Sequence, residues 1–240
     1  MNSNSEKFLQ VFNTIEKHLR WLTGSDRYTP FYQLVDRASA GDAAVRRMRT
    51  DLLEFADLRN AIVHERTDGH VIAEPNEISV QRFEKIKSLL TEPPGVGNYM
   101  VRNVRILPAE MAIGKAAELL YKSGFSQAPV YSGEIYLGLL TTDTIARWFA
   151  DYLEAEIVDI ATTRVDEVLE YTEDKEHVYF LDRSATVFHV FELLDKYQGL
   201  GKRLDAILVT HSGSSKEKLL GMLTIWDLPE LYKAIEISRE

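Results

Sequence analysis

An internal repeat constrains the fold of this chain more than any other feature. The segment Gly138-Leu139-Leu140-Thr141 recurs 83 residues later as Gly221-Met222-Leu223-Thr224. Each copy follows an apolar run typical of a strand and precedes an amphipathic run typical of a helix. This period is too long for a solenoid and fits two copies of a small α/β unit. A duplicated unit of this kind is expected to build one site per copy, in the cleft between the copies.

The first copy predicts the order strand, helix, strand, strand, helix. Its elements are expected at residues 104–108, 109–121, 128–131, 135–140 and 141–153. The second copy predicts the same order, at residues 178–181, 185–197, 206–209, 219–223 and 224–237. Gly124 is placed to end the first helix of the first copy. The fold class is therefore α+β, with two βαββα repeats at 98–160 and 161–240.

A longer motif surrounds the second copy of the repeat. The sequence from Gly221 to Asp227 reads glycine, two apolar residues, threonine, two variable residues and aspartate, at the mouth of the last helix. Matching lead-in segments precede the two copies at 96–100 and 165–169. On these grounds residues 96–240 resemble a tandem pair of cystathionine-β-synthase-type (CBS) domains. The resemblance implies a disc-shaped pair that binds an adenine nucleotide and usually acts as a sensor.

The chemistry of the second motif is compatible with a nucleotide. A helix N-terminus favours phosphate, because its N–H groups are unpaired and the helix dipole is positive there. Thr224 would add a hydroxyl and Asp227 would accept the ribose hydroxyls, while the apolar strand residues Ala206 and Ile207 would cover the base. The same threonine and aspartate also fit a capping box, which contributes about 1 kcal/mol to a helix without any ligand. Both interpretations stay open.

The first copy departs from the motif. In Thr141-Thr142-Asp143-Thr144 a threonine stands where the acid belongs, and Asp143 comes one position early, about 100° around a helix. A site built on Thr141, Thr144 and Ala128 is therefore either degenerate or altered in its choice of ligand. The ligands compatible with the resemblance are AMP, ADP, ATP, a cyclic dinucleotide and S-adenosylmethionine, and no cofactor is required.

Composition excludes several classes of site. The chain has no cysteine, which excludes disulfides, thiolate zinc sites and cysteine nucleophiles. Its six histidines show no spacing with a carboxylate that would suggest zinc, so no metal is expected. No apolar stretch approaches the roughly 20 residues of a membrane helix, and the N-terminus lacks a basic and then apolar signal. We expect a cytoplasmic protein without a membrane partner.

Charge is unevenly distributed along the chain. The formal net charge of −9 argues against a general nucleic-acid surface, and DNA is not an expected partner. Residues 1–97 hold 13 basic and 14 acidic side chains, which leaves a net charge of −8 on the repeats. The N-terminal part is thus the half in which a polyanion such as RNA would dock.

The N-terminal part predicts an all-α four-helix bundle at residues 1–92, joined to the repeats by a linker at 93–97. Its helices are expected at residues 6–23, 31–38, 42–65 and 78–90. Apolar residues recur at helical spacing in the first of them. The sequence Pro93-Pro94-Gly95 indicates the linker.

One position on the long N-terminal helix carries a charge within an apolar stripe. Arg59 occupies it, followed by Asn60 and His64, and a charge there is costly unless it is paired or faces an interface. The run resembles the Arg-polar-x-x-x-His motif of HEPN-type helical domains, many of which are metal-independent ribonucleases. The resemblance implies that Arg59 holds a phosphate and His64 moves a 2′-hydroxyl proton at a dimer interface. Alternatively, Asn60 and His64 bond to each other and Arg59 pairs with Glu54, Asp57 or a partner's acid.

These patterns together predict a regulatory protein. The CBS pair would bind an adenine-type nucleotide, change the packing of a homodimer and so change the output of the helical bundle. Two alternatives stay open: a nucleotide-regulated endoribonuclease that uses Arg59, Asn60 and His64, and a CBS dimerisation scaffold that binds no ligand. No dinucleotide fingerprint or P-loop is present, which disfavours a self-contained metabolic enzyme.

Overall fold

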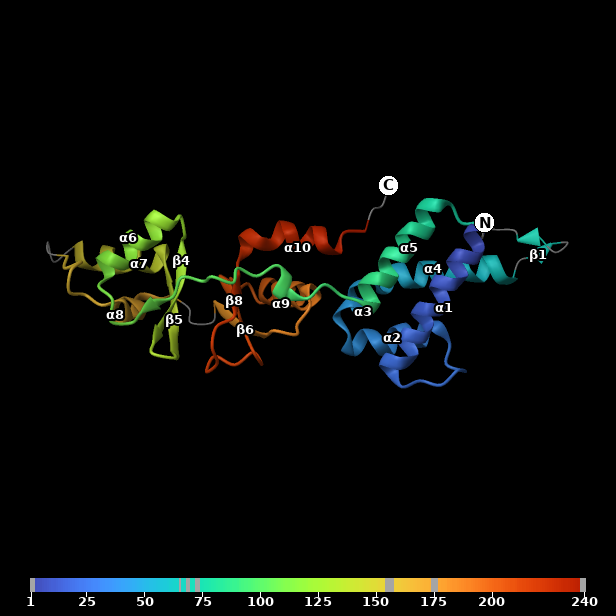
Figure 1. The fold of residues 1–240 in the computed structure, drawn as a ribbon, viewed down its shortest axis with the longest axis horizontal. Helices are drawn as coiled ribbons and strands as arrows, with labels where there is room; N and C mark the ends of the chain where they lie inside the picture. The colour runs from blue at the N-terminus through green and yellow to red at the C-terminus, as the bar shows by residue number, and fades with distance from the viewer. Residues whose placement is uncertain are drawn as a thin grey trace. The chain divides into compact units, whose positions relative to one another are not determined.

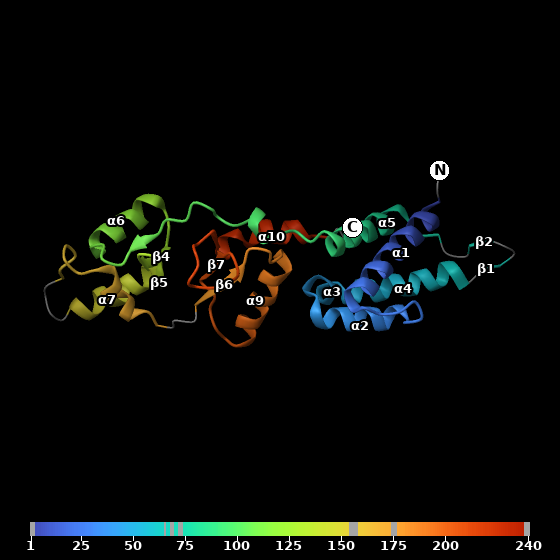
Figure 2. The same cartoon turned by 60° about the horizontal axis from the view of Figure 1, so that its bottom comes forward.

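The computed structural model describes residues 3–64, 66–67, 70–71, 74–153, 158–173 and 177–237, without the side chains of 64, 66, 67, 70 and 71. The chain divides into two compact units. One unit is Met1–Gly95 with Thr186–Leu193 and Glu230–Glu240, and the other is Val96–Ala185 with Leu194–Pro229. Figures 1 and 2 show the elements coloured along the chain.

The N-terminal region is helical, as predicted. Its helices are α1 (Asn4–Thr23), α2 (Phe31–Gly41), α3 (Ala43–Arg47), α4 (Arg49–His64) and α5 (Glu77–Thr91) (Figure 1). Ser3 and Glu6 form a capping box that begins α1, and Gly24 ends α1 with a φ of 61°. The apolar stripe of α1 is buried, and Phe8 stacks on Phe83 at 4.8 Å between ring centroids. Burial of each such ring contributes about 1.5–3 kcal/mol, so α1 is held mainly by its packing.

The long helix predicted at 42–65 is two helices in the structure. Asp42 caps α3, because its Oδ1 accepts a hydrogen bond from the Val45 backbone N–H at 2.9 Å. Met48 then leaves helical geometry, with φ −98° and ψ 8°, and α4 begins at Arg49. Among the described residues this gives five N-terminal helices where the sequence predicts four. A short antiparallel pair, β1 (Arg66–Thr67) and β2 (His70–Val71), was not predicted.

The first repeat has the predicted element order. It contains η1 (Val96–Asn98), β3 (Leu107–Pro108), α6 (Ile113–Ser123), β4 (Gln127–Ser132), β5 (Ile135–Thr141) and α7 (Thr142–Tyr152). The central strand β4 pairs parallel with β3 and antiparallel with β5. The strand β3 is shorter than predicted, because only Leu107 and Pro108 pair with β4. Gly124 ends α6 with a φ of 69°, as predicted.

The second repeat has the same strand pairing. Its elements are α8 (Val165–Val168), η3 (Leu169–Tyr171), β6 (Val178–Asp182), α9 (Val187–Gly199), β7 (Ala206–Thr210), β8 (Gly221–Leu223), η4 (Ile225–Asp227) and α10 (Leu228–Ile235). The strand β7 is central, parallel to β6 and antiparallel to β8. A 3-10 turn, η4, takes the first three positions of the helix predicted from Thr224.

Two hydrophobic clusters hold the repeats. One fills the first repeat around Leu107, Val130 and Trp148. The other joins β5 of the first repeat to β7 of the second through Leu139 and Leu208. The sheets of the two repeats therefore share buried side chains, and the ends of their strands open into the clefts between the repeats.

The glycine of each motif makes room for the lead-in segment of the other repeat. Val101 and Met222 exchange two backbone hydrogen bonds, of 2.9 and 3.0 Å. A Cβ atom on Gly221 would lie 2.9 Å from the Val101 carbonyl oxygen, which is closer than a Cβ atom tolerates. At Gly138 the corresponding neighbour is the side chain of Leu169, at 3.2 Å. The duplicated glycine is thus a packing requirement of the paired repeats.

Candidate functional site

Two clefts lie between the repeats, and both repeats contribute to each. The first cleft has a volume of about 240 Å³ and is lined by residues from 136–147, 166–173 and 203–205, with His177 and Val178. The second cleft has a volume of about 340 Å³ and is lined by residues from 101–105, 124–127 and 222–227. Thr141 and Thr144 line the first cleft, and Thr224 and Asp227 line the second.

In the second cleft the capping box predicted for Thr224 and Asp227 is present. The Thr224 N–H donates to Asp227 Oδ2 at 2.7 Å, and the Thr224 hydroxyl donates to the same oxygen at 3.1 Å. The Trp226 N–H donates to Thr224 Oγ1 at 3.3 Å. Both bonds to Asp227 use Oδ2, so neither of them occupies its Oδ1. The box and a ligand contact are therefore compatible, which the sequence alone treated as competing interpretations.

The rest of the second cleft comes from the first repeat. Its walls are mainly apolar or uncharged, with Val101, Val104, Phe125, Met222, Asn103, Ser126 and Gln127. Arg105 and Asp227 are its charged residues among those described. Sequence reasoning missed the residues from 101–105 and 124–127. The available signal was Gly124, since a left-handed helix end directs the following residues away from the helix axis.

In the first cleft a buried threonine takes the place of the acid. Thr141 Oγ1 caps α7 by accepting from the Thr144 N–H at 3.0 Å, and the two threonine hydroxyls lie 2.9 Å apart. Only 1% of Thr144 is exposed. The first cleft therefore has the threonine cap that the second cleft also has, but it lacks a carboxylate at the position of Asp227.

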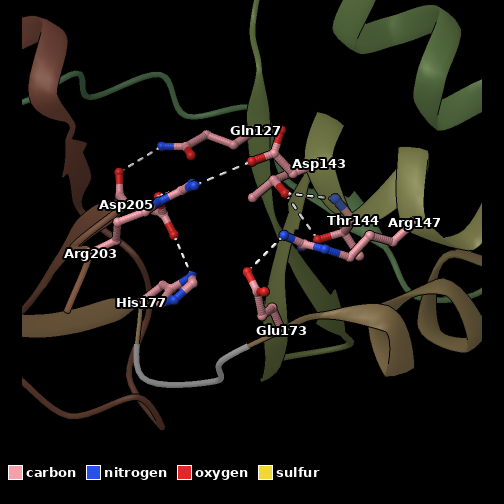
Figure 3. Close-up of polar contacts among 9 residues, drawn as sticks. Gln127, Asp143, Thr144, Arg147, Glu173, His177, Arg203 and Asp205 are labelled. Atoms are coloured by element: carbon pink, nitrogen blue, oxygen red, sulfur yellow. Dashed lines mark hydrogen bonds and ion pairs between the residues drawn. The ribbon is translucent and has the colours of Figure 1, made fainter. Parts of the chain in front are cut away.

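A polar network crosses the first cleft (Figure 3). Arg203 donates to Asp205 Oδ1 at 2.8 and 3.1 Å and reaches Asp143 Oδ2 at 3.4 Å. The Gln127 amide donates to the Asp205 backbone carbonyl at 2.8 Å, and His177 Nδ1 lies 2.6 Å from Asp205 Oδ2. The hydrogen bond with Asp205 raises the pKa of the Arg203 guanidinium above its ordinary value. The first cleft is thus bridged by its own side chains.

The two clefts also differ in charge. The first cleft is lined by five acidic side chains and two arginines. One of those arginines, Arg147, donates to Glu173 at 2.7 Å, so its charge is compensated as well. The second cleft has one arginine and one acid. Because acids outnumber arginines by three in the first cleft and are balanced in the second, a phosphate is repelled less in the second cleft.

Three predicted site residues lie outside the lining of both clefts, namely Ala206 and Ile207, expected to cover the base, and Ala128, expected in the first site. Ala128, Ala206 and Ile207 are buried, and none of them lines either cleft. They occupy the central strands β4 and β7, and the hydrophobic clusters include Ala128 and Ala206. The prediction assigned the base to the repeat that carries the motif, whereas the structure opposes each motif with residues of the other repeat.

The N-terminal candidates are only partly described. Arg59 is half-buried, its guanidinium lies over the Phe12 ring at 5.7 Å, and its Nη1 donates to Asn60 Oδ1 at 3.4 Å. Stacking on an aromatic ring thus replaces the expected ion pair with Glu54 or Asp57. The side chain of His64 lies outside the described residues, so its role in proton transfer and its alternative hydrogen bond with Asn60 both stay predictions. Within the described residues there is no group of three or more histidines and acids that could hold a metal ion. No described helix is both long and apolar enough to cross a membrane.

Comparison with known families finds a match for the first repeat. Residues 96–151 match the model of the CBS domain family. No curated protein matches the chain. Among solved structures, CbpB in complex with c-di-AMP is 17% identical with a TM-score of 0.47, covering 65% of this chain and 93% of its own. CBSX2 in complex with AMP is 16% identical with a TM-score of 0.44, covering 59% and 98%. A CBS domain-containing protein of unknown function from Kribbella flavida is 14% identical with a TM-score of 0.45, covering 58% and 97%. The match to the CBS domain family thus covers residues 96–151, which hold the first repeat as far as α7.

Proposed function

We propose that the two repeats form a CBS pair that binds an adenine-type nucleotide in the second cleft and regulates the N-terminal helical region. The observation that carries the proposal is the Thr224–Asp227 box, which lines a cleft between the repeats. The first cleft is less suited to this role, because Arg203 reaches across it to Asp143 and also donates to Asp205.

The ribose and the phosphate of a nucleotide each have a partner in the second cleft. Asp227 Oδ1 accepts a ribose hydroxyl, while Oδ2 stays bonded to Thr224. The exposed guanidinium of Arg105 provides a cation for a phosphate. AMP, ADP, ATP, a cyclic dinucleotide that contains adenine, such as c-di-AMP, and S-adenosylmethionine share the adenosine unit that this arrangement would recognise.

Regulation requires that the nucleotide bind one state of the protein better than another. We propose a cytoplasmic homodimer in which occupancy of the second cleft changes the packing of paired chains, with residues 1–92 as the responding part. Size-exclusion chromatography with and without ligand measures this directly. An assembly that is the same in both conditions contradicts the coupling and leaves the binding site standing.

Thermal shift with AMP, ATP, c-di-AMP and S-adenosylmethionine tests the site. A ligand at 100 times its Kd stabilises the protein by about 2.7 kcal/mol. Asp227→Ala is expected to abolish the shift, because it removes the acceptor of the ribose hydroxyls. Asn76→Ala is the matched control: Asn76 caps α5 by accepting from the Ser79 N–H at 2.7 Å, so it loses a cap and keeps the second cleft. No shift with any compound would favour the ligand-free scaffold.

The competing prediction is an endoribonuclease that uses Arg59, Asn60 and His64. General acid or base catalysis by a histidine is worth about 100- to 10,000-fold, so His64→Ala would abolish measurable RNA cleavage. Cleavage that survives this substitution, or none by the wild type with and without AMP, rejects that function. Neither result bears on the second cleft.

A further inference from the structure

Two aromatic rings line the second cleft from opposite repeats. Trp226, in η4 of the second repeat, is 80% exposed, and Phe125, after α6 of the first repeat, is 49% exposed. Val101 and Met222 extend the apolar wall beside them. Water around such rings is unfavourable, and a flat apolar ligand group that displaces it gains the free energy of burial.

Both rings stand on backbone that is fixed by hydrogen bonds. Trp226 lies between Thr224 and Asp227, and its N–H donates to Thr224 Oγ1 at 3.3 Å. Phe125 follows the left-handed Gly124, and its N–H donates to the Leu120 carbonyl at 3.1 Å. The backbone that carries the two rings therefore does not have to be ordered by the ligand, which lowers the cost of binding.

The tryptophan position distinguishes the two motifs. Counting from Thr141 and Thr224, the third residue is Asp143 in the first repeat and Trp226 in the second. Asp143 forms the ion pair with Arg203 that bridges the first cleft. Trp226 instead leaves the second cleft open and adds a ring to it. A different tryptophan, Trp148, is buried in the first repeat, as expected of a core residue.

We propose that Phe125 and Trp226 form an aromatic clamp that holds the base of the nucleotide. The clamp rests on the proposed function and deepens it, because it assigns the planar part of the ligand to two residues from different repeats. Stacking of a base on an aromatic side chain is sequence-tolerant, since every base has a π-face. The clamp therefore contributes affinity for a nucleotide, and the bound base contacts both repeats.

Isothermal titration of the full chain with AMP and with ribose 5-phosphate tests the clamp. Trp226→Ala is expected to weaken AMP binding about 10- to 100-fold, the range measured for loss of one stacking partner. Trp226→Phe keeps a ring and is expected to stay within a few-fold of the wild type. Ribose 5-phosphate has no base, so its affinity is expected to be the same in all three proteins. Trp21→Ala removes another exposed tryptophan, on α1, and serves as the control.

Tryptophan fluorescence gives a second readout. AMP is expected to quench part of the wild-type signal, and this quenching is lost in Trp226→Phe and kept in Trp21→Phe. Equal AMP affinity in Trp226→Ala and the wild type, with binding lost in Asp227→Ala, overturns the clamp and keeps the proposed function. A change of oligomeric state in Trp226→Ala without a change of AMP affinity overturns the clamp as well, and assigns the ring to an interface. No binding of AMP or c-di-AMP to the wild type overturns both proposals.

Discussion

The first and second clefts have the same origin in the repeat and opposite characters. Both begin at a threonine that caps the next helical turn, Thr141 or Thr224. Three residues later one cleft has the buried Thr144 and the other the carboxylate of Asp227. Moving the acid by one position takes it out of the box, and Asp143 reaches across to Arg203 instead. Both repeats thus have the threonine cap, whereas the residues that follow the threonine decide whether the cleft is open to a ligand.

Thr144→Asp tests this comparison most severely. Thr144 is 1% exposed, so a carboxylate there would be buried without the partial exposure that Asp227 has. A buried unpaired charge costs about 3 kcal/mol or more, which exceeds the gain of about 1 kcal/mol from completing a capping box. We expect a net loss of about 2 kcal/mol in the free energy of unfolding, measured in urea.

Thr142→Asp is the matched control, because Thr142 is exposed in the first turn of α7 and an acid there is favourable. A Thr144→Asp protein that is as stable as the wild type and binds two nucleotides per chain would contradict the distinction. That result would mean that the acid at position 144 is all that the first cleft lacks for binding a nucleotide.

The two motif glycines give the next contrast. Gly221→Ala places a methyl group against the Val101 carbonyl, which its hydrogen bonds to Met222 hold in place. Gly138→Ala meets only the end of the Leu169 side chain, which can rotate away. Overpacking against fixed atoms costs about 1–3 kcal/mol, so Gly221→Ala is expected to lose about 2 kcal/mol and Gly138→Ala less than 1.

Chemical denaturation of both variants measures this difference, and AMP titration measures its effect on the site. Val101 lines the second cleft, so Gly221→Ala is also expected to weaken AMP binding. Equal destabilisation by the two alanines would mean that the lead-in segments are held alike in both repeats.

The sequence was a good guide to whatever depends on neighbouring residues. Gly124 and the Thr224–Asp227 box act within a few residues of themselves, and both have the predicted geometry. Asp42 shows where local signals compete, because it was assigned to the start of one long helix and instead caps a separate short one that ends at Met48. The composition of the second cleft depends on how the repeats pack, so Phe125 was not selected from the sequence. For the same reason the sequence did not show that Ala206 lies outside the lining of both clefts, and its contact with a ligand stays a prediction.

The ion pair across the first cleft gives the smallest effect. Arg203 and Asp143 are 60% and 53% exposed in their side chains, and solvent screens such pairs to below about 1 kcal/mol. Asp143→Ala is therefore expected to change the free energy of unfolding by only a few tenths of a kcal/mol, with less effect at high salt. It is also expected to leave AMP affinity unchanged, because Asp143 does not line the second cleft. Asp205 is 10% exposed and holds Arg203, so Asp205→Ala is expected to cost more than Asp143→Ala. An Asp143→Ala protein that gains a second AMP site would show that this exposed pair, weak as it is for stability, is what keeps a nucleotide out of the first cleft.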